Sequence, residues 1–115
     1  MLFKRYEYLE FEIYSNVVKK MLDQDKEAIL IDARTKMERK EGYIPGSILI
    51  PSYEFDRYLE LLNDKNRTII VYCNSGGRSK EVVSKLRKLG YVNSYSMING
   101  IYEWEYGIVM DRRFC

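Results

Sequence analysis

A buried strand, a glycine-containing loop and the start of a helix follow one another in Thr68-Ile69-Ile70-Val71-Tyr72-Cys73-Asn74-Ser75-Gly76-Gly77-Arg78-Ser79. The run 68–72 is short, apolar and β-branched, which is typical of a strand buried on both faces of a parallel sheet. From Ser79 onward, apolar residues recur at helical spacing, and Gly90 follows as a terminator. Residues 73–78 are therefore predicted to join a buried strand to an amphipathic helix.

Further strands and helices alternate on both sides of this unit. Short apolar runs at 28–31, 48–50 and 94–98 are strand candidates, and helical patterns capped by Ser15 and Ser52 lie between them. Alternation of this kind predicts right-handed βαβ units. We expect a single α/β domain over 15–115 with a mostly parallel central sheet and helices on both faces. Residues 1–14 are expected to add an edge strand or a lead-in arm.

The overall composition excludes several classes of protein. The chain has 115 residues, of which 46% are hydrophobic and 31% charged, so it is expected to form one globular domain. A formal net charge of +2 gives no reason to expect nucleic acid or an anionic membrane as partner. No apolar run approaches the roughly 18–20 residues that span a bilayer. No secretory signal is visible at the N-terminus, and a cytoplasmic location is expected.

The numbers of histidines and cysteines limit the kinds of side-chain chemistry that the chain can perform. The chain has no histidine, which excludes histidine-based triads, HExxH zinc sites and cysteines activated by a histidine. Its two cysteines, Cys73 and Cys115, cannot build a disulfide framework or a four-cysteine zinc site. No metal site is therefore predicted, and chemistry on side chains is expected to depend on one cysteine.

The position of Cys73 suits a reactive thiolate. Ligands in open α/β sheets bind at the carboxyl ends of strands, where this residue lies. Residues 74–79 contain no proline and so offer six consecutive N–H donors, while Gly76 and Gly77 allow the backbone to turn them inward. The helix beginning near Ser79 adds its positive end. Such surroundings lower a cysteine pKa from about 8.5 to roughly 3.5–7.5. The alternative interpretation of Cys73 is a small core residue.

Arg78 lies where a positive charge opposes the helix dipole, so a nearby anion or carboxylate is expected to accompany it.

Four segments together resemble the single-domain rhodaneses, a family of sulfurtransferases. The loop at 73–79 resembles the family's active-site pattern Cys-x-Ser-Gly-x-Arg-Ser. Residues 30–34 resemble its strand ending in Asp-x-Arg, residues 42–47 its Gly-His-Ile-Pro-Gly-Ala turn, and residues 99–104 its Gly-Gly-x-x-x-Trp segment. The resemblance covers about residues 15–108, and the four motifs are specific only in combination.

The resemblance implies a mechanism and roles for individual residues. Cys73 would attack a sulfane donor such as thiosulfate, a polysulfide or a persulfide, and would hold the sulfur as a persulfide. A thiol, cyanide or a sulfur-accepting protein would then remove it, with no cofactor or metal. The persulfide cradle would be formed by Asn74, Ser75, Gly76, Gly77, Arg78 and Ser79. Asp32 and Arg34 are expected to form buried ion pairs that support the loop.

Two positions depart from the family pattern. Tyr43 replaces a common histidine, but in a structural turn, so activity is not put in doubt. Asn74 stands where many members carry arginine, which leaves Arg78 as the loop's one cationic side chain and weakens the case for thiosulfate as donor.

Two other functions compete with sulfur transfer. Cysteine phosphatases and arsenate reductases also surround a cysteine with loop N–H donors, but five residues separate their cysteine from their arginine. Here four residues separate Cys73 from Arg78. A non-catalytic docking module on the same fold is the other alternative, and an intact loop with its cysteine argues against it.

The remaining side chains singled out have structural interpretations. Trp104 is expected to pack on the sheet, and Lys85, Arg87 and Lys88 to form a solvated helix face on which an acidic protein could dock. Cys115 is interpreted as a free tail thiol, with a second-thiol relay as the alternative.

Overall fold

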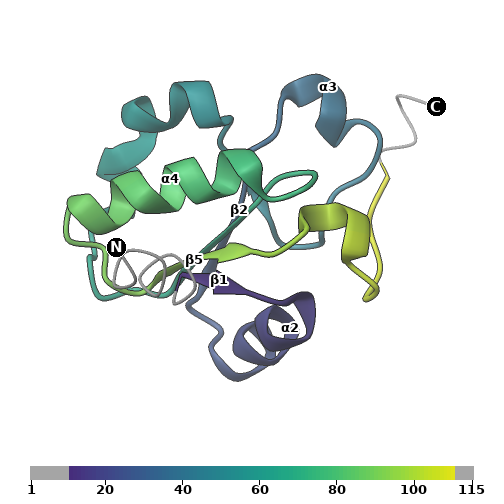
Figure 1. The fold of residues 1–115 in the computed structure, drawn as a ribbon, viewed down its shortest axis with the longest axis horizontal. Coiled ribbons are helices and arrows are strands. Elements are labelled where there is room, and N and C mark those ends of the chain that lie inside the picture. The colour runs from purple at the N-terminus through teal and green to yellow at the C-terminus, as the bar shows by residue number, and fades with distance from the viewer. Residues whose placement is uncertain (1–10, 111–115) are drawn as a thin grey trace, which may run out of the picture.

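The computed structural model describes residues 11–110 and contains a five-stranded sheet with helices against both faces (Figure 1). The strands are β1 (Glu12–Ile13), β2 (Ile29–Asp32), β3 (Ile48–Leu49), β4 (Ile69–Tyr72) and β5 (Ser94–Met97). Their order is β1-β5-β4-β2-β3, and every neighbouring pair is parallel. The predicted α/β class is confirmed. The most β-branched run, β4, is the central strand.

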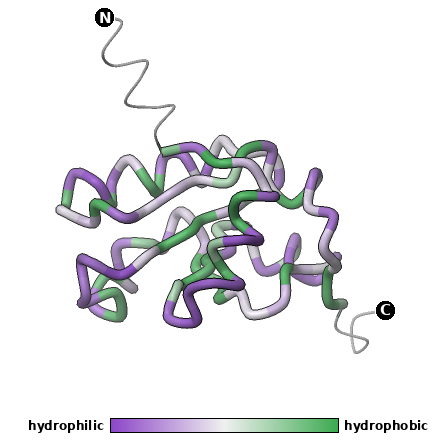
Figure 2. Tube along the Cα trace, turned by 90° about the horizontal axis from the view of Figure 1, so that it is seen from below, coloured by the Kyte–Doolittle hydropathy of each residue, from purple (hydrophilic) through white to green (hydrophobic). Residues whose placement is uncertain are grey.

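Alternation along the strands divides the core into two layers. On β4, Ile69 and Val71 face one layer, which also holds Phe55 and Leu86, while Ile70 and Tyr72 face the other. Because both faces of a central strand are buried, its sequence is a continuous apolar run. Figure 2 shows hydrophobic segments gathered toward the interior and hydrophilic ones at the outer turns.

The helical segments cover the two faces of the sheet. They are α2 (Ser15–Gln24), α3 (Lys36–Arg39), the 3₁₀ helix η1 (Ser52–Leu62), α4 (Gly77–Lys88) and the 3₁₀ turn η2 (Gly100–Glu103). Side chains of η1 and α4 pack on one face, and side chains of α2 and η2 pack on the other (Figure 1).

Three helix starts differ from the sequence-based expectation. Tyr14 and Pro51 take the capping positions expected of Ser15 and Ser52, and neither makes a side-chain cap bond. Helix α4 begins at Gly77, two residues before Ser79. Its cap is Gly76, at φ +108°, a conformation that favours glycine over serine. The positive end of α4 therefore lies closer to Cys73 than expected.

Only part of the predicted N-terminal arm lies in the described range. Glu12 and Ile13 pair in parallel with Ser96 and Met97 and form an edge strand. Residues 1–10 lie outside the described residues, as does Cys115. Between residues 11 and 110, no helix is both long and apolar enough to cross a membrane.

Candidate active site

Cys73 is the first residue after β4, at the carboxyl edge of the sheet between β2 and β5. It is buried, with 1% of its surface exposed. The backbone N–H of Gly76 donates to its Sγ at 3.1 Å, and its thiol lies 3.6 Å from Ser79 Oγ. The loop between β4 and α4 thus folds back over the sulfur at the end of the central strand.

Opposing effects act on the Cys73 thiol. Burial raises its pKa because the charged form loses hydration. Hydrogen bonds from the N–H and hydroxyl of Ser79 and from the N–H groups of Gly76 and Arg78 lower it, and they outweigh burial. The pKa of Cys73 therefore lies below its ordinary value, the direction that the loop predicted.

Ser79, the last residue of the predicted persulfide cradle, reaches the site with its side chain as well as its backbone. It is buried in the first turn of α4, and its hydroxyl donates to the carbonyl of Gly76 at 3.1 Å. The same hydroxyl lies 2.7 Å from that of Ser96 on β5, which is also buried. Ser79 is therefore a side-chain partner of the sulfur.

Arg78 has the carboxylate partner that its position at a helix start predicted. Its two terminal nitrogens bind the two oxygens of Glu38, at 2.6 and 2.8 Å. Chiefly because of this pair, the pKa of Glu38 falls to about 2 and that of Arg78 rises. Glu38 also closes a capping box with Thr35, which fixes its position at the end of α3. The Asn74 side-chain amide donates to Glu38 at 2.5 Å.

Asp32 and Arg34 form the predicted buried ion pair beside the loop. The Arg34 Nε and Nη2 donate to the two Asp32 oxygens, each at 2.9 Å. Arg34 also donates to the carbonyl of Gly42 at 2.7 Å and to Asn74 Oδ1 at 3.4 Å. Arg39 adds a second contact to Asp32 at 3.1 Å. The pair thus connects the loop to the turn that follows α3.

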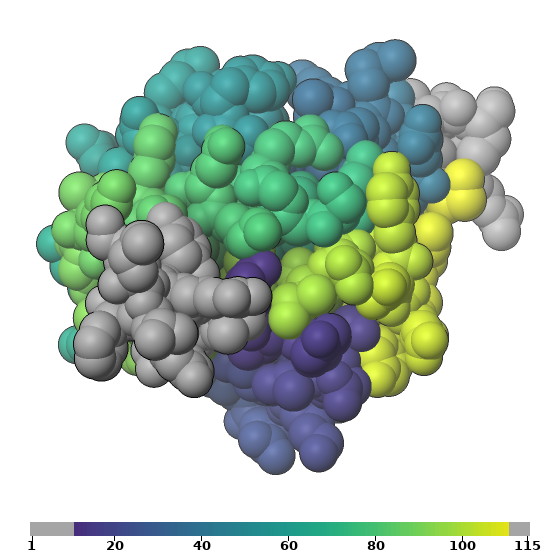
Figure 3. Space-filling model, in the orientation of Figure 1, coloured from purple at the N-terminus to yellow at the C-terminus, as the bar shows by residue number. Residues whose placement is uncertain are grey.

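The last part of the described chain supports the loop from below. The N–H groups of Ile101 and Tyr102 donate to the carbonyls of Cys73 and Asn74, at 2.9 and 3.3 Å. Gly100 permits this approach, because a Cβ there would lie 2.2 Å from the Cys73 carbonyl oxygen. In Figure 3 this yellow segment lies against the green start of α4.

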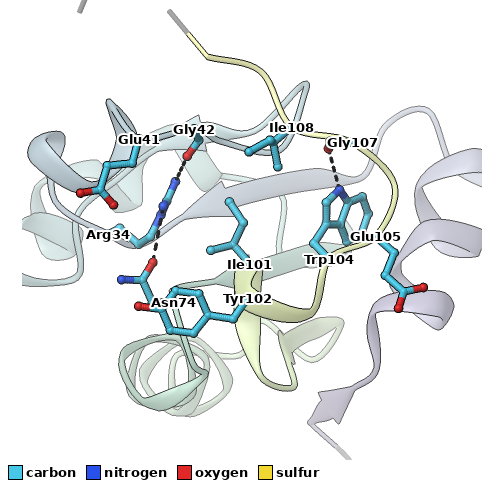
Figure 4. Close-up of a pocket in the computed structure, with 10 residues that line it drawn as sticks. All are labelled: Arg34, Glu41, Gly42, Asn74, Ile101, Tyr102, Trp104, Glu105, Gly107 and Ile108. Carbon is cyan, nitrogen blue, oxygen red and sulfur yellow. Dashed lines mark hydrogen bonds between the residues drawn. The ribbon is translucent and has the colours of Figure 1, made fainter. Parts of the chain in front are cut away.

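A cavity of about 310 Å³ opens beside Asn74 (Figure 4). Arg34 and Asn74 lie on one side of it, and Ile101 and Ile108 face it from the C-terminal segment. Trp104 packs against the core as expected, and its indole N–H donates to the Gly107 carbonyl at 2.9 Å. Glu41 and Glu105 also line the cavity.

Not every side chain singled out in the sequence takes part in the site. Asn74 turns its amide toward Glu38 and Arg34, Ser75 is exposed in the loop, and Gly77 is exposed at the start of α4. Tyr43 lies just before the turn at 45–46 and its backbone pairs with that of Val109, while the Arg39 guanidinium is 3.9 Å from its ring centre.

The expected solvated face on α4 is wrong for Arg87. Its guanidinium donates to the Ser94 carbonyl at 2.8 Å and stacks 3.7 Å from the Phe11 ring centre. Phe11 is distant along the chain, so helical periodicity could not reveal this contact. Lys85 and Lys88 are exposed, as expected.

Sequence reasoning missed Glu38, Ser96 and the close approach of Gly100. The first could have been found, because Thr35 and Glu38 have the spacing of a capping box, which marks the short helix α3. Ser96 carried no comparable signal, since its role depends on which strand lies beside α4.

Comparisons with known proteins agree with this geometry. The Rhodanese-like domain family matches residues 15–106. A sulfurtransferase of Allochromatium vinosum is 29% identical over 93 residues, which are 81% of this chain and 86% of that protein. The crystal structure of a rhodanese-like domain protein from Staphylococcus aureus has a TM-score of 0.73 and 27% identity, covering 87% of this chain and 97% of that one.

A longer relative contains a segment similar to this chain. A tRNA uridine(34) hydroxylase of Erwinia tasmaniensis is 33% identical over 92 residues, which are 76% of this chain but 26% of that protein. This chain therefore corresponds to about a quarter of that relative. Because the family match includes the cysteine loop, the Asp32–Arg34 pair and the supporting segment at 100–102, the chain belongs to the Rhodanese-like domain family.

Proposed function

We propose that this protein is a sulfurtransferase in which Cys73 carries the transferred sulfur as a persulfide. The observation behind the proposal is the buried Cys73 sulfur, which faces the N–H groups of Gly76, Arg78 and Ser79 at the start of α4. Preorganised donors of this kind stabilise a negative charge on sulfur without a histidine base. The sulfurtransferase name of the Allochromatium relative supports the same reaction class.

Catalysis would proceed by two displacements at sulfur. The Cys73 thiolate attacks the outer sulfur of the donor, a new S–S bond forms, and the donor's remaining group leaves with the electrons of the bond that breaks. An acceptor thiolate or cyanide then attacks the outer sulfur of the Cys73 persulfide, and the Cys73 thiolate is released. The loop's N–H donors would hold the outer sulfur when it is anionic. No step requires a metal, an organic cofactor or a change in net oxidation state.

Loop size favours sulfur over a tetrahedral oxyanion. Four residues separate Cys73 from Arg78, and α4 already begins at Gly77. The backbone therefore closes tightly around the cysteine sulfur itself, with the Gly76 N–H only 3.1 Å away. Arg78, which would have to bind a phosphate or arsenate, is held by Glu38 in a two-point ion pair.

Intact mass measurement after incubation with a sulfane donor tests the proposal. We expect the full chain to gain one sulfur atom that cyanide removes, and Cys73→Ser to gain none. Cys115→Ser is the control and should still gain the sulfur. Equal loss in both variants would indicate a two-thiol relay, and a phosphate or arsenate adduct on Cys73 would favour the phosphatase or reductase class. The absence of any adduct on the parent chain would support a docking module.

A further inference from the structure

The charge around Cys73 differs from what its loop sequence indicates. Between residues 73 and 79, Arg78 is the single cationic side chain. Both of its terminal nitrogens bind Glu38, whose pKa is held at about 2. Glu38 is therefore ionised at any pH near neutrality, and it neutralises the arginine that faces the catalytic sulfur.

Other polar groups near the loop are engaged as well. The Asn74 amide nitrogen, at the position next to the cysteine, is held by the same Glu38 carboxylate. Arg34 and Arg39 both bind Asp32, and their remaining contacts include the carbonyls of Gly42 and Ser47. With Cys73 as a thiolate, Cys73, Arg78 and Glu38 sum to a charge of −1. Asp32, Arg34 and Arg39, which reach the loop at Asn74, sum to +1. Glu38 thus removes the positive charge that Arg78 would otherwise present beside the sulfur.

The charge on a sulfur donor and on its leaving group determines how strongly the negative charge of Glu38 opposes the reaction. Attack on thiosulfate, S–SO₃²⁻, breaks the S–S bond and releases sulfite with two negative charges, leaving the persulfide Cys–S–S⁻. Attack on the outer sulfur of an organic persulfide, R–S–SH, leaves Cys–S–SH and releases R–S⁻, with one negative charge. The carboxylate of Glu38, held against Arg78, opposes the first reaction more than the second, because repulsion grows with the charge that approaches and develops.

We propose that Glu38 is a specificity-determining residue that directs this site toward persulfide donors and away from thiosulfate. The inference rests on the proposed sulfurtransferase function and adds the substrate class. Glu38 touches Arg78 and Asn74 and not the sulfur, so it acts through the arginine that it neutralises and the amide that it holds.

Glu38→Gln removes the charge, together with the acceptor that Oε2 offers to Asn74 and to the second Arg78 nitrogen, and keeps the capping box. Glutamine also serves as the third residue of a capping box, so the contact with Thr35 and the turn of α3 are kept. Its amide oxygen still accepts one hydrogen bond from Arg78. Glu41→Gln is the matched control, because Glu41 has the same charge and lies three residues further along, exposed and at the cavity beside Asn74.

The experiment compares kcat/KM for thiosulfate with kcat/KM for the persulfide of 2-mercaptoethanol, using cyanide as acceptor throughout. We expect Glu38→Gln to raise the thiosulfate-to-persulfide ratio about tenfold, mainly through a lower KM for thiosulfate, and Glu41→Gln to change it less than twofold. Added salt should raise the thiosulfate rate of the parent and have a weaker effect on Glu38→Gln, because screening weakens repulsion between like charges.

The outcomes separate this inference from the function on which it rests. An active parent whose donor ratio is the same in Glu38→Gln, or shifts equally in Glu41→Gln, would overturn the role of Glu38 and leave sulfur transfer standing. A parent that takes up sulfur from neither donor would overturn both. A Glu38→Gln variant with lower rates for both donors and an unchanged ratio would show that Glu38 only holds the loop in place.

Discussion

Ser79 and Ser96 place their hydroxyl oxygens 2.7 Å apart between α4 and β5, and Ser79 Oγ is also 3.6 Å from the sulfur of Cys73. In the thiol form the Ser79 hydroxyl donates to the Gly76 carbonyl. Once Cys73 is a thiolate, that hydroxyl can turn its proton to the sulfur, and Ser96 can donate to Ser79 in its place. Ser96 thus lies two hydrogen bonds from the Cys73 sulfur.

Removing either hydroxyl should raise the pKa of Cys73. Ser79→Ala deletes a direct donor to the thiolate, and a hydrogen bond to a charged group contributes enough to lower the thiolate population roughly tenfold when lost. Ser96→Ala should have a smaller effect in the same direction. Iodoacetamide alkylation followed against pH measures both. Ser84→Ala, at a half-buried serine five residues beyond Ser79 along α4, is the control, and a Ser96→Ala curve that coincides with it would contradict this assignment.

Two adjacent glycines in the loop should respond differently to alanine. Gly76 has φ +108°, where an L side chain is strained by about 1–3 kcal/mol. Gly77 begins α4 and has open space where a Cβ would stand. We expect Gly76→Ala to lower both stability and sulfur transfer, and Gly77→Ala to leave both nearly unchanged. Urea unfolding and turnover of the two variants provide the comparison, and equal losses would show that the left-handed turn at Gly76 is unimportant.

The strands could be predicted from the sequence because they are buried on both faces of the sheet. Ile69, Ile70 and Val71 have no solvent-facing side, so an uninterrupted apolar run marks them whatever their neighbours are. The role of Cys73 in the site could also be predicted from local sequence. It follows the carboxyl end of such a strand, and two glycines and a helix start come directly after it.

Contacts between distant residues could not be predicted in the same way. Glu38 meets Arg78 across 40 residues, and the sequence indicated only that Arg78 needs some carboxylate. The sequence predicts a helix start near Ser79, but the helix begins at Gly77 after a glycine with positive φ, which places the Ser79 hydroxyl in the first turn. Here the left-handed backbone conformation of Gly76 determines where α4 starts, and therefore where the Ser79 hydroxyl lies.

The close packing of Gly100 under the loop predicts a large effect of a small change. Gly100→Ala would place a methyl group 2.2 Å from the Cys73 carbonyl oxygen and 2.5 Å from that of Asn74. Because both contacts are backbone atoms, the loop must move, and we expect loss of sulfur transfer together with a lower thermal midpoint. Gly46→Ala is the control, since Gly46 also has positive φ but open space around it. Similar effects in both variants would mean that backbone strain, and not the collision, is responsible.

The Glu38–Arg78 pair should stabilise the fold in a defined pH window. Binding to Arg78, first among the causes, lowers the pKa of Glu38 from its ordinary value of 4.5 to about 2. A depressed pKa means that the folded state holds the proton less tightly than the unfolded state. The contribution is therefore fully present above about pH 4.5 and is lost as the pH falls toward 2.

Urea unfolding at pH 7 and pH 3 measures this contribution. Glu38→Gln should be less stable than the parent at pH 7, and the difference should shrink at pH 3. The two side chains are partly exposed, so the difference should be modest and reduced by salt. A gap between parent and variant that is the same at both pH values would show that the carboxylate charge does not contribute to folding.

The segment at 100–102, which holds the carbonyls of the Cys73 loop, is synthesised later than the loop itself. Residue 73 leaves the ribosome well before Gly100, Ile101 and Tyr102, whose backbone holds the carbonyls of the loop. Strand β5, which brings Ser96 to Ser79, is also made after the cysteine. A nascent chain that ends before residue 94 therefore carries Cys73 without these supports. The donors that lower the pKa of Cys73 are thus made soon after the cysteine, whereas the backbone that holds their loop in place is completed only when nearly the whole domain has been translated.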